Sequence, residues 1–526
     1  MIGVPDLPYR ATMPEIVRRA ASIFGDADYI VMLDRRISFR EAEAASRRLA
    51  KQLLAAGVTK GARIGIHLVT GPEWAVAFLA VTRIGAVAMP FSTIYRPAEL
   101  RTAMRTGDVS VLLSSPTMLG KDHEAFLEDA LPGLARALPG RLRIAEVPYL
   151  RSIWLLGHSS CGWAKRFEIC SDDAGEAVDG FDEAFLEAVE AEVTPADVLT
   201  VVFTSGTTAA PKAVVHTHGA VLRKTAPASN AALNAIFGGR VLSLMPFFWI
   251  GGMQEVLAAL QSGATLLALE RLSASAALEL GKREQATSLM GNPQALRSML
   301  GRTAIEEAIP TLRPLPRRPW EGGPSRHADT ATGIGMTETF GPWTAVEGFE
   351  CRVVDTDTGE VMDEGQTGEF QVRGYGLMQG LYKREREEVF TADGFYRTGD
   401  LGYVDGGLFY FTARLKDMIK TKGANVAPAE VEAVLNANPR VRTSFVAGLP
   451  HDTFGEEVVA GVVAEEGHTI DVAALLAECR RVLSPYKVPT MIAVLRGEAI
   501  PQLANGKPDR RAVAAMLAEH RRAAMA

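Results

Sequence analysis

A run of small and hydroxylated residues that ends in a lysine carries the strongest chemical signal in the sequence. The run, TSGTTAAPK at positions 204–212, follows an apolar stretch at 198–203 that predicts a strand. Small residues let backbone N–H groups approach an anion closely, and hydroxyl groups add further donors. Lys212 adds a positive charge suited to a phosphate group. The run lacks the spacing of a Walker A loop, and an ordinary Ser/Thr turn is the alternative interpretation.

Carboxylates and a further lysine recur later in short glycine-containing motifs. Glu338 lies in GMTET, Asp400 in YRTGDL and Lys507 in NGKPDRR. A carboxylate oxygen is a hard ligand that suits Mg²⁺, and an ammonium group can stabilise developing negative charge. Taken singly, each residue also has a structural explanation, namely a surface glutamate, an Asx turn and an exposed turn lysine.

Together these motifs resemble those of the acyl-adenylate-forming enzymes, which include acyl-CoA synthetases, peptide-synthetase adenylation domains and firefly-type luciferases. Besides the 204–212 run, the matching segments are GMTET, GEFQVRG, YRTGDL, ARLKDMIKTKGANVAPAEVE and NGKPDRR, in that order along nearly the whole chain. The resemblance implies an ATP-dependent carboxylic acid–CoA ligase. Such an enzyme forms an acyl-AMP and pyrophosphate, then passes the acyl group to coenzyme A, with Mg²⁺ bound beside the ATP.

The resemblance also implies a role for each matched residue. Lys507, Glu338 and Lys212 are the expected catalytic residues, and Glu338 is the expected magnesium ligand. Lys416 is the expected hinge of a rotating small domain, and Gly423 is expected to line the CoA tunnel. The residues expected to bind ATP and AMP are Thr204, Ser205, Gly206, Thr207, Thr208, Lys212, Gly335, Thr337, Asp400 and Arg414.

An uncharged aromatic segment, MPFFWIGG at 245–252, resembles the wall of the family's acyl pocket. The family often has a histidine where this chain has Trp249. An apolar wall suits a fatty, aromatic or alicyclic acid and disfavours an amino acid, whose ammonium group would need a carboxylate. Ordinary core packing is the alternative for these aromatic residues. The predicted acyl-pocket residues are Phe248, Trp249, Gly252, Ile334 and Phe340.

The elements that must position these motifs alternate between helix and strand patterns. Ser38 and Glu41 form a capping-box pattern, and apolar residues follow at helical spacing up to Gly57. Strands are predicted at 62–69, 86–91 and 198–203 and a helix at 72–84, although Arg83 interrupts the apolar run there. This predicts an α/β fold in which a large N-terminal domain has mixed, mostly parallel sheets layered with helices.

From about residue 416 the pattern changes to a small α+β unit. Helices are predicted at 429–436 and 472–483, and strands at 441–447, 457–464 and 491–495. The predicted domains are therefore an AMP-binding domain with the ATP and acyl pocket at 1–414, and a mobile lid domain that carries the catalytic lysine at 415–526.

Several positions depart from the family's pattern. Alanine stands at 209, 213 and 413, where glycine is usual, and Ile334 replaces an aromatic residue beside the adenine. The region 312–350 is also shorter than usual. These departures motivate one alternative, a degenerate nucleotide- or acyl-binding protein, while a stand-alone acyl-AMP ligase that loads a carrier protein is another.

Composition narrows the possible partners and compartment. The net charge of −6 argues against nucleic acid, and four cysteines without metal-ligand spacing indicate reduced thiols in the cytoplasm. No apolar run is long enough to span a membrane, and the N-terminus lacks a signal-peptide pattern. His216 and His218 are expected to be structural histidines at a strand-to-helix junction, not metal ligands. A homodimer is the expected assembly.

Overall fold

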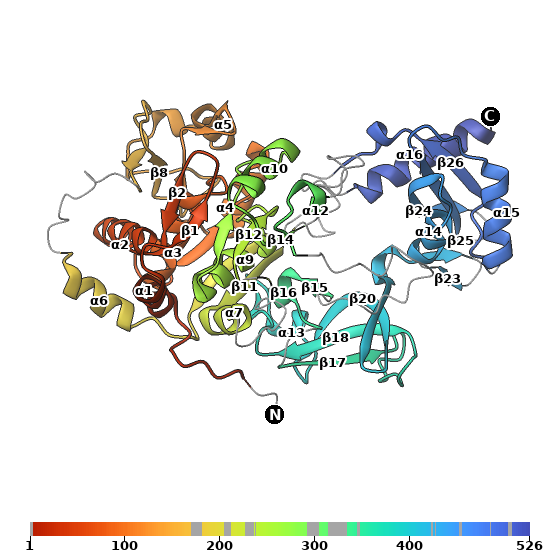
Figure 1. The fold of residues 1–526 in the computed structure, drawn as a ribbon, viewed down its shortest axis with the longest axis horizontal. Coiled ribbons are helices and arrows are strands. Elements are labelled where there is room, and N and C mark those ends of the chain that lie inside the picture. Colours follow the sequence, from red (N-terminus) through yellow and green to blue (C-terminus); the bar gives the residue numbers. More distant parts are fainter. Residues whose placement is uncertain are drawn as a thin grey trace. The chain divides into compact units, whose positions relative to one another are not determined.

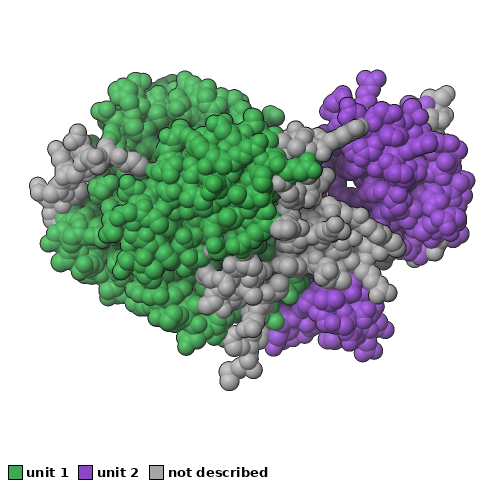
Figure 2. All heavy atoms as spheres, in the orientation of Figure 1, with its two compact units in different colours: residues 1–316, 335–349, 374–389 green, residues 317–334, 350–373, 390–526 purple. Residues whose placement is uncertain are grey.

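The computed structural model describes most of the chain, and contacts divide it into two units (Figure 2). Unit 1 comprises 1–316, 335–349 and 374–389, and unit 2 comprises 317–334, 350–373 and 390–526. The boundary predicted between residues 414 and 415 is that of a moving lid, which this division by contacts does not test. It therefore stays a prediction. The described residues are 4–169, 181–204, 212–226, 236, 238–291, 305–313, 334–344, 348–421, 424–426, 428–451, 455–483, 485–502 and 508–525.

Figure 1 shows the helices and strands of the whole chain. Unit 1 contains an eight-stranded sheet in the order β19-β11-β10-β4-β3-β5-β8-β9. The strands from β10 to β9 pair in parallel, whereas β11 pairs antiparallel with both β10 and β19. The sheet is thus mostly parallel, as predicted. Its strands are β3 (Arg63–Ile66), β4 (Val87–Pro90), β5 (Val111–Ser114), β8 (Ser152–Leu156), β9 (Lys165–Phe167), β10 (Val198–Thr204), β11 (Lys212–Thr217) and β19 (Gly380–Leu381).

A second sheet of unit 1 has five strands in the order β14-β12-β13-β1-β2. All of its pairs are parallel except β1 with β2. One apolar core cluster includes residues from both sheets and from the helices between them. The strands are β1 (Asp28–Val31), β2 (Arg36–Ser38), β12 (Arg240–Ser243), β13 (Thr265–Leu267) and β14 (Ser288–Met290). The helices of unit 1 that matter below are α1 (Met13–Phe24), α2 (Phe39–Ala55), α3 (Pro72–Arg83), α6 (Glu183–Ala191), α7 (His218–Thr225) and α9 (Ile250–Ser262).

Local sequence accounts for where these helices begin and end. The Ser38 hydroxyl accepts a hydrogen bond from the Glu41 N–H, and the Glu41 carboxylate accepts one from the Ser38 N–H, which confirms the capping box at the start of α2. Gly57 follows the end of α2 with a φ of +82°, a conformation that glycine adopts without strain. Helix α3 has Pro72 in its first turn and is buried along almost its whole length, which explains its continuous apolar sequence.

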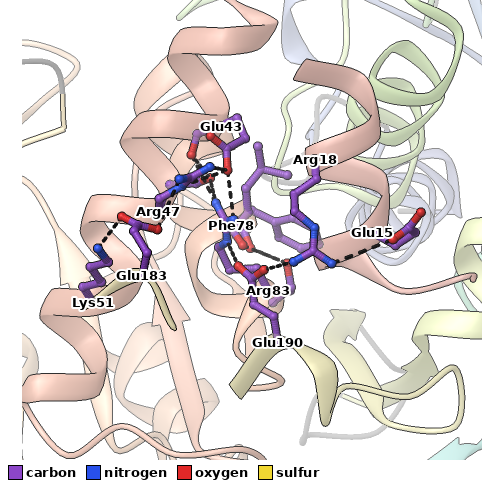
Figure 3. A network of polar contacts seen from close by, with 12 residues as sticks. Glu15, Arg18, Glu43, Arg47, Lys51, Phe78, Arg83, Glu183 and Glu190 are labelled. Atoms are coloured by element: carbon purple, nitrogen blue, oxygen red, sulfur yellow. Dashed lines mark hydrogen bonds and ion pairs between the residues drawn. The ribbon is translucent and has the colours of Figure 1, made fainter. Parts of the chain in front are cut away.

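Arg83, at the end of α3, is buried in a network of charges (Figure 3). Its guanidinium lies 2.6 Å from Glu190 and 3.0 Å from Glu43, and it also donates to the Ser46 hydroxyl at 2.8 Å. Glu190 belongs to α6 and pairs with Arg18 of α1 as well. The network therefore joins α1, α2, α3 and α6 through one arginine that the sequence pattern presented only as an interruption.

Unit 2 contains two sheets, each described by its own pairing. The first has the order β17-β18-β20-β21, and β20 pairs antiparallel with both of its neighbours. In the second, β22 and β24 flank β25, and β26 pairs with β25 in parallel. The strands are β17 (Phe349–Val354), β18 (Gly368–Gly374), β20 (Tyr396–Asp405), β21 (Leu408–Arg414), β22 (Ile419–Thr421), β23 (Ala424–Val426), β24 (Val441–His451), β25 (Gly455–Ala464) and β26 (Met491–Leu495).

Helices cover both faces of the second sheet. Along β25, Val458 and Val462 pack with α14 and α15, while Val459 and Val463 pack with α16. This alternation is the period-two pattern of a strand buried on two sides. The helices are α14 (Pro428–Asn436), α15 (Val472–Val482) and α16 (Arg510–Met525). The predicted small α+β unit is confirmed element by element. Within the described ranges, no helix combines the length and the apolar character needed to cross a bilayer.

The Arg83 network predicts a large effect on stability. Arg83→Met leaves the buried carboxylates of Glu43 and Glu190 with fewer counter-charges, so the free energy of unfolding should fall by about 3–5 kcal/mol. Urea unfolding followed by circular dichroism measures this loss. The matched control is Arg40→Met, because Arg40 pairs with Asp26 at 2.8 Å on the surface. That substitution should cost at most about 1 kcal/mol, and equal losses in the two variants would contradict the assignment.

Candidate nucleotide-binding site

The lysine-terminated run connects strands β10 and β11 of the large sheet. Strand β10 ends at Thr204, β11 begins at Lys212, and the two residues lie opposite each other in the antiparallel pair. Because β10 is parallel to β4, the run leaves β10 at the carboxyl edge of the parallel strands. Ligands of open α/β sheets commonly bind at that edge. The predicted residues Ser205, Gly206, Thr207 and Thr208 lie outside the described part of the chain.

The GMTET motif forms a tight hairpin in unit 1. Strands β15 (Gly335–Met336) and β16 (Gly341–Pro342) flank a single 3-10 turn, Thr337–Thr339. A side chain at Gly335 would come within 2.6 Å of the Gly341 backbone, so the close approach of the two strands requires glycine there. Phe340 adopts a φ of 50°, which is unusual for a bulky residue.

This hairpin brings Glu338, the expected magnesium ligand, close to Lys212. Glu338 Oε1 lies 3.8 Å from Lys212 Nζ, and their side chains are 12% and 43% exposed. At this distance the two opposite charges attract each other without a hydrogen bond between them. Mg²⁺ bound with a nucleotide takes one or two carboxylates and several phosphate and water oxygens. A single half-buried glutamate beside a lysine fits that requirement.

A second pair of predicted residues meets in unit 2. Asp400 of β20 lies opposite Arg414 of β21, and Arg414 Nε is 2.8 Å from Asp400 Oδ1. The Asp400 side chain is only 3% exposed, so the guanidinium partners a carboxylate that is otherwise withdrawn from water. Gly399 precedes it with a φ of +69°, and its N–H donates to Glu369 at 2.9 Å. The structure thus fixes this turn from both neighbouring strands.

The predicted acyl-pocket residues in unit 1 lie around the start of α9. Phe248 is buried, and Trp249 is half-buried and packs edge-to-face against it at 5.7 Å. A side chain at Gly252 would meet the Pro246 carbonyl oxygen at 2.2 Å, so the backbone approach there excludes any larger residue. Phe340 is fully buried in the same core cluster. The remaining predicted residue, Ile334, is half-buried and belongs to unit 2.

The predicted hinge and lid residues are only partly described. Lys416 lies in a 3-10 turn, Leu415–Asp417, but its side chain is outside the described part, as are Gly423 and Lys507. Gln502 and Pro508, which flank the segment of Lys507, form an isolated antiparallel bridge. The roles of these three residues therefore remain predictions.

The two histidines after the lysine-terminated run take the structural positions expected of them. His216 lies in β11 and His218 begins α7, so they lie at a strand-to-helix junction. Burial lowers the pKa of each to about 3, and both rings are therefore neutral at physiological pH. His216 Nε2 donates to the Thr337 carbonyl oxygen at 2.8 Å, and His218 Nδ1 accepts from the Met13 N–H at 3.2 Å.

Two buried ionisable residues near these motifs escaped the sequence analysis. Lys224 of α7 is fully buried, and burial lowers its pKa well below the ordinary value. Glu255 of α9 is also buried, and burial raises its pKa to about 8 despite a hydrogen bond from Ser243. Lys224 occurs three residues after Val221 on the apolar face of its helix, which is a signal that sequence reading can use.

Comparisons with known proteins identify the family of the chain. The family of AMP-binding enzymes matches residues 17–382, and the AMP-binding enzyme C-terminal domain matches residues 430–507. A 3-[(3aS,4S,7aS)-7a-methyl-1,5-dioxo-octahydro-1H-inden-4-yl]propanoyl:CoA ligase from Mycobacterium tuberculosis is 31% identical, across 94% of this chain and 97% of that protein. The sulfoacetate–CoA ligase of Cupriavidus necator is 28% identical, across 95% of this chain and 96% of its own.

The fold is shared with solved structures as well. ATP-bound MatB from Rhodopseudomonas palustris superposes with a TM-score of 0.73 at 22% identity, covering 96% of this chain and 98% of that chain. The predicted superfamily and fold class are confirmed. The chain belongs to the AMP-binding enzyme family and is an AMP-forming acid–CoA ligase that uses ATP, Mg²⁺ and coenzyme A.

Proposed function

We propose that this ligase activates an apolar carboxylic acid, of fatty, aromatic or alicyclic type, and that the residues predicted from its motifs carry out the reaction. The observation that carries the assignment of the site is the approach of Lys212 and Glu338 at the end of β10. A cation and a hard anionic ligand 3.8 Å apart at a sheet edge match the needs of a magnesium-bound triphosphate.

The chain's own groups divide the work of adenylation. Lys212 neutralises phosphate charge, and Glu338 supplies an oxygen ligand for Mg²⁺, which offsets the charge of the phosphates when bound. Asp400 accepts the ribose hydroxyls, while Arg414 compensates the charge of this carboxylate. Lys507 approaches the acyl carboxylate and the α-phosphate during the first half-reaction. Catalysis in this scheme is chiefly positioning and charge neutralisation.

The proposed acyl group follows from the lack of charge along the wall segment. Phe247 and Phe248 are buried there, and Trp249 is half-buried. The carboxyl group of Glu255, on the helix that follows, has its pKa raised to about 8 by burial and is mostly protonated at neutral pH. Such a wall offers no fixed counter-charge for an ammonium group. The alicyclic acyl group in the name of the mycobacterial relative is consistent with this class.

Three finer assignments belong to the same proposal. We assign coenzyme A, not a carrier protein, as the acyl acceptor, in keeping with the CoA ligases among the relatives. Three described cysteines, Cys161, Cys351 and Cys479, are free thiols, which suits the predicted cytoplasmic location. A homodimer remains the expected assembly.

Pyrophosphate release and thioester formation test the function directly. The purified chain is assayed with ATP and Mg²⁺ on a panel of fatty, aromatic and alicyclic acids, with and without CoA. Thioester should form only when CoA is present and only with apolar acids. Sulfoacetate and an amino acid serve as charged controls. Pyrophosphate without thioester would indicate a carrier-loading ligase, and faster turnover of a charged acid would contradict the proposed acyl class.

A specific role of Lys507 in adenylation can be distinguished from general damage to the lid. Lys507→Ala should slow adenylate formation by about 100-fold or more, which is typical for removal of a group that stabilises transition-state charge. Conversion of supplied acyl-AMP and CoA into thioester should stay within a few-fold of wild type. The control is Lys487→Ala, whose lysine pairs with Glu430 in the same unit. Equal slowing of both half-reactions by Lys507→Ala would refute its assigned role.

The buried carboxyl group of Glu255 predicts a pH-dependent effect on stability. Between pH 4.5 and 8 the folded state retains a proton that the unfolded state releases. The free energy of unfolding therefore falls by about 1.4 kcal/mol for each unit by which the pH rises in this range. Glu255→Gln removes that dependence. The variant's advantage in unfolding free energy should therefore grow from pH 5 to pH 8, as measured by urea unfolding. A difference that is constant over this range would show that Glu255 ionises normally.

A further inference from the structure

The backbone carbonyls of the hairpin at 337–341 are held by donors from three other segments of unit 1. His216 Nε2 donates to the Thr337 oxygen at 2.8 Å, and the Met378 N–H donates to the Glu338 oxygen at 2.8 Å. Lys224 Nζ donates to the Thr339 oxygen and lies 3.4 Å from the Gly341 oxygen. Glu338, whose carboxylate faces Lys212, therefore lies between two anchored neighbours.

Burial of Lys224 at this position lowers the stability of the folded state. It is fully buried, and its contacts among the described residues are carbonyl oxygens and the ring of Phe349, whose centroid is 4.7 Å from Nζ. A buried amine without a carboxylate partner costs stability that an apolar residue of the same length would not. Among the described residues, the carbonyls that it fixes and the ring of Phe349 offset this cost.

His216 of β11 contacts the same hairpin through the Thr337 carbonyl. A carbonyl oxygen can only accept, so the hydrogen bond to Thr337 assigns the proton of the neutral ring to Nε2. The ring also packs edge-to-face against Phe340 at 5.1 Å. Phe340 has a φ of 50°, a conformation that persists in a bulky residue only when its surroundings enforce it. The donor and the aromatic contact together hold the turn closed.

We propose that Lys224 and His216 are positioning residues, which hold the hairpin so that the Glu338 carboxylate stays beside Lys212 and receives the magnesium–nucleotide complex. This inference rests on the proposed role of Glu338. A positioning role of this kind affects the two half-reactions differently, whereas a purely structural role would affect both alike. Glu338 is needed while ATP is bound, whereas the conversion of acyl-AMP into thioester involves neither Mg²⁺ nor the β- and γ-phosphates.

Matched substitutions separate the effect of losing the hydrogen bond from the effect of changing the size of each side chain. Lys224→Met removes the donor but keeps the length, while Lys224→Gln keeps a neutral donor. His216→Phe removes the donor but keeps a ring, while His216→Gln restores an N–H near the position of Nε2. The control is His218→Phe, because His218 is equally buried but bonds to Met13 instead.

The measurement is the magnesium dependence of adenylation, together with the rate of thioester formation from supplied acyl-AMP. Lys224→Met and His216→Phe should raise the Mg²⁺ concentration for half-maximal adenylation about 10-fold or more and slow adenylation about 10- to 100-fold. Their thioester half-reaction should stay within about 3-fold of wild type, and the glutamine variants should recover most of the loss. His218→Phe should leave the magnesium dependence unchanged.

A double-mutant cycle with Glu338→Ala gives the decisive outcome. If Lys224 acts through Glu338, then Lys224→Met should slow the Glu338→Ala enzyme by less than 2-fold. An undiminished loss in that background, or equal slowing of both half-reactions, would overturn the positioning role. If instead Glu338→Ala leaves wild-type activity and magnesium dependence intact, the proposed function of Glu338 fails, and this result is distinct. If Lys224→Met does not fold, the same double-mutant cycle is carried out with His216→Phe and His216→Gln.

Discussion

An ionisable side chain withdrawn from water must be paired, solvated by dipoles or neutralised, because a bare buried ion costs several kcal/mol. The described part of unit 1 contains an example of each solution. Arg83 meets two carboxylates, Lys224 meets backbone carbonyls, and Glu255 retains its proton. Each of these groups lies on a helix, so its surroundings depend on where that helix packs. The buried ionisable groups thus constrain the packing of α3, α7 and α9 in addition to the apolar contacts.

The same constraint separates the scaffold from the site. Backbone atoms of the 337–341 hairpin are held by donors with little access to water, whereas the side chains of Lys212 and Glu338 keep some exposure. A similar division is present in unit 2, where Asp400 is buried and Arg414 is half-exposed. Fixed backbone with accessible side chains is the arrangement that preorganises a site for a charged ligand.

Local patterns were sufficient to predict several elements but none of the long-range buried polar pairings. The capping box at Ser38, the apolar run of α3 and the strands β24, β25 and β26 depend on neighbours within a few residues, so sequence reading found them. It missed the short strands β22 and β23. Arg83 and Glu190 are 107 residues apart, and Lys224 and Thr339 are 115 apart. No periodicity encodes such contacts. The resemblance to a known family implied separate roles for Lys212 and Glu338, but the approach of the two side chains is a finding of the structure.

The pairing of β11 with β19 has a consequence for the growing chain on the ribosome. Strand β11 is complete at residue 217, but its outer neighbour is Gly380–Leu381. At 5–20 residues per second, that neighbour emerges roughly 10–30 seconds later. During this interval the edge of β11 has unsatisfied N–H and C=O groups, which other chains can pair with. The strand that follows the lysine-terminated run thus has an unpaired edge for part of the time in which the chain is made.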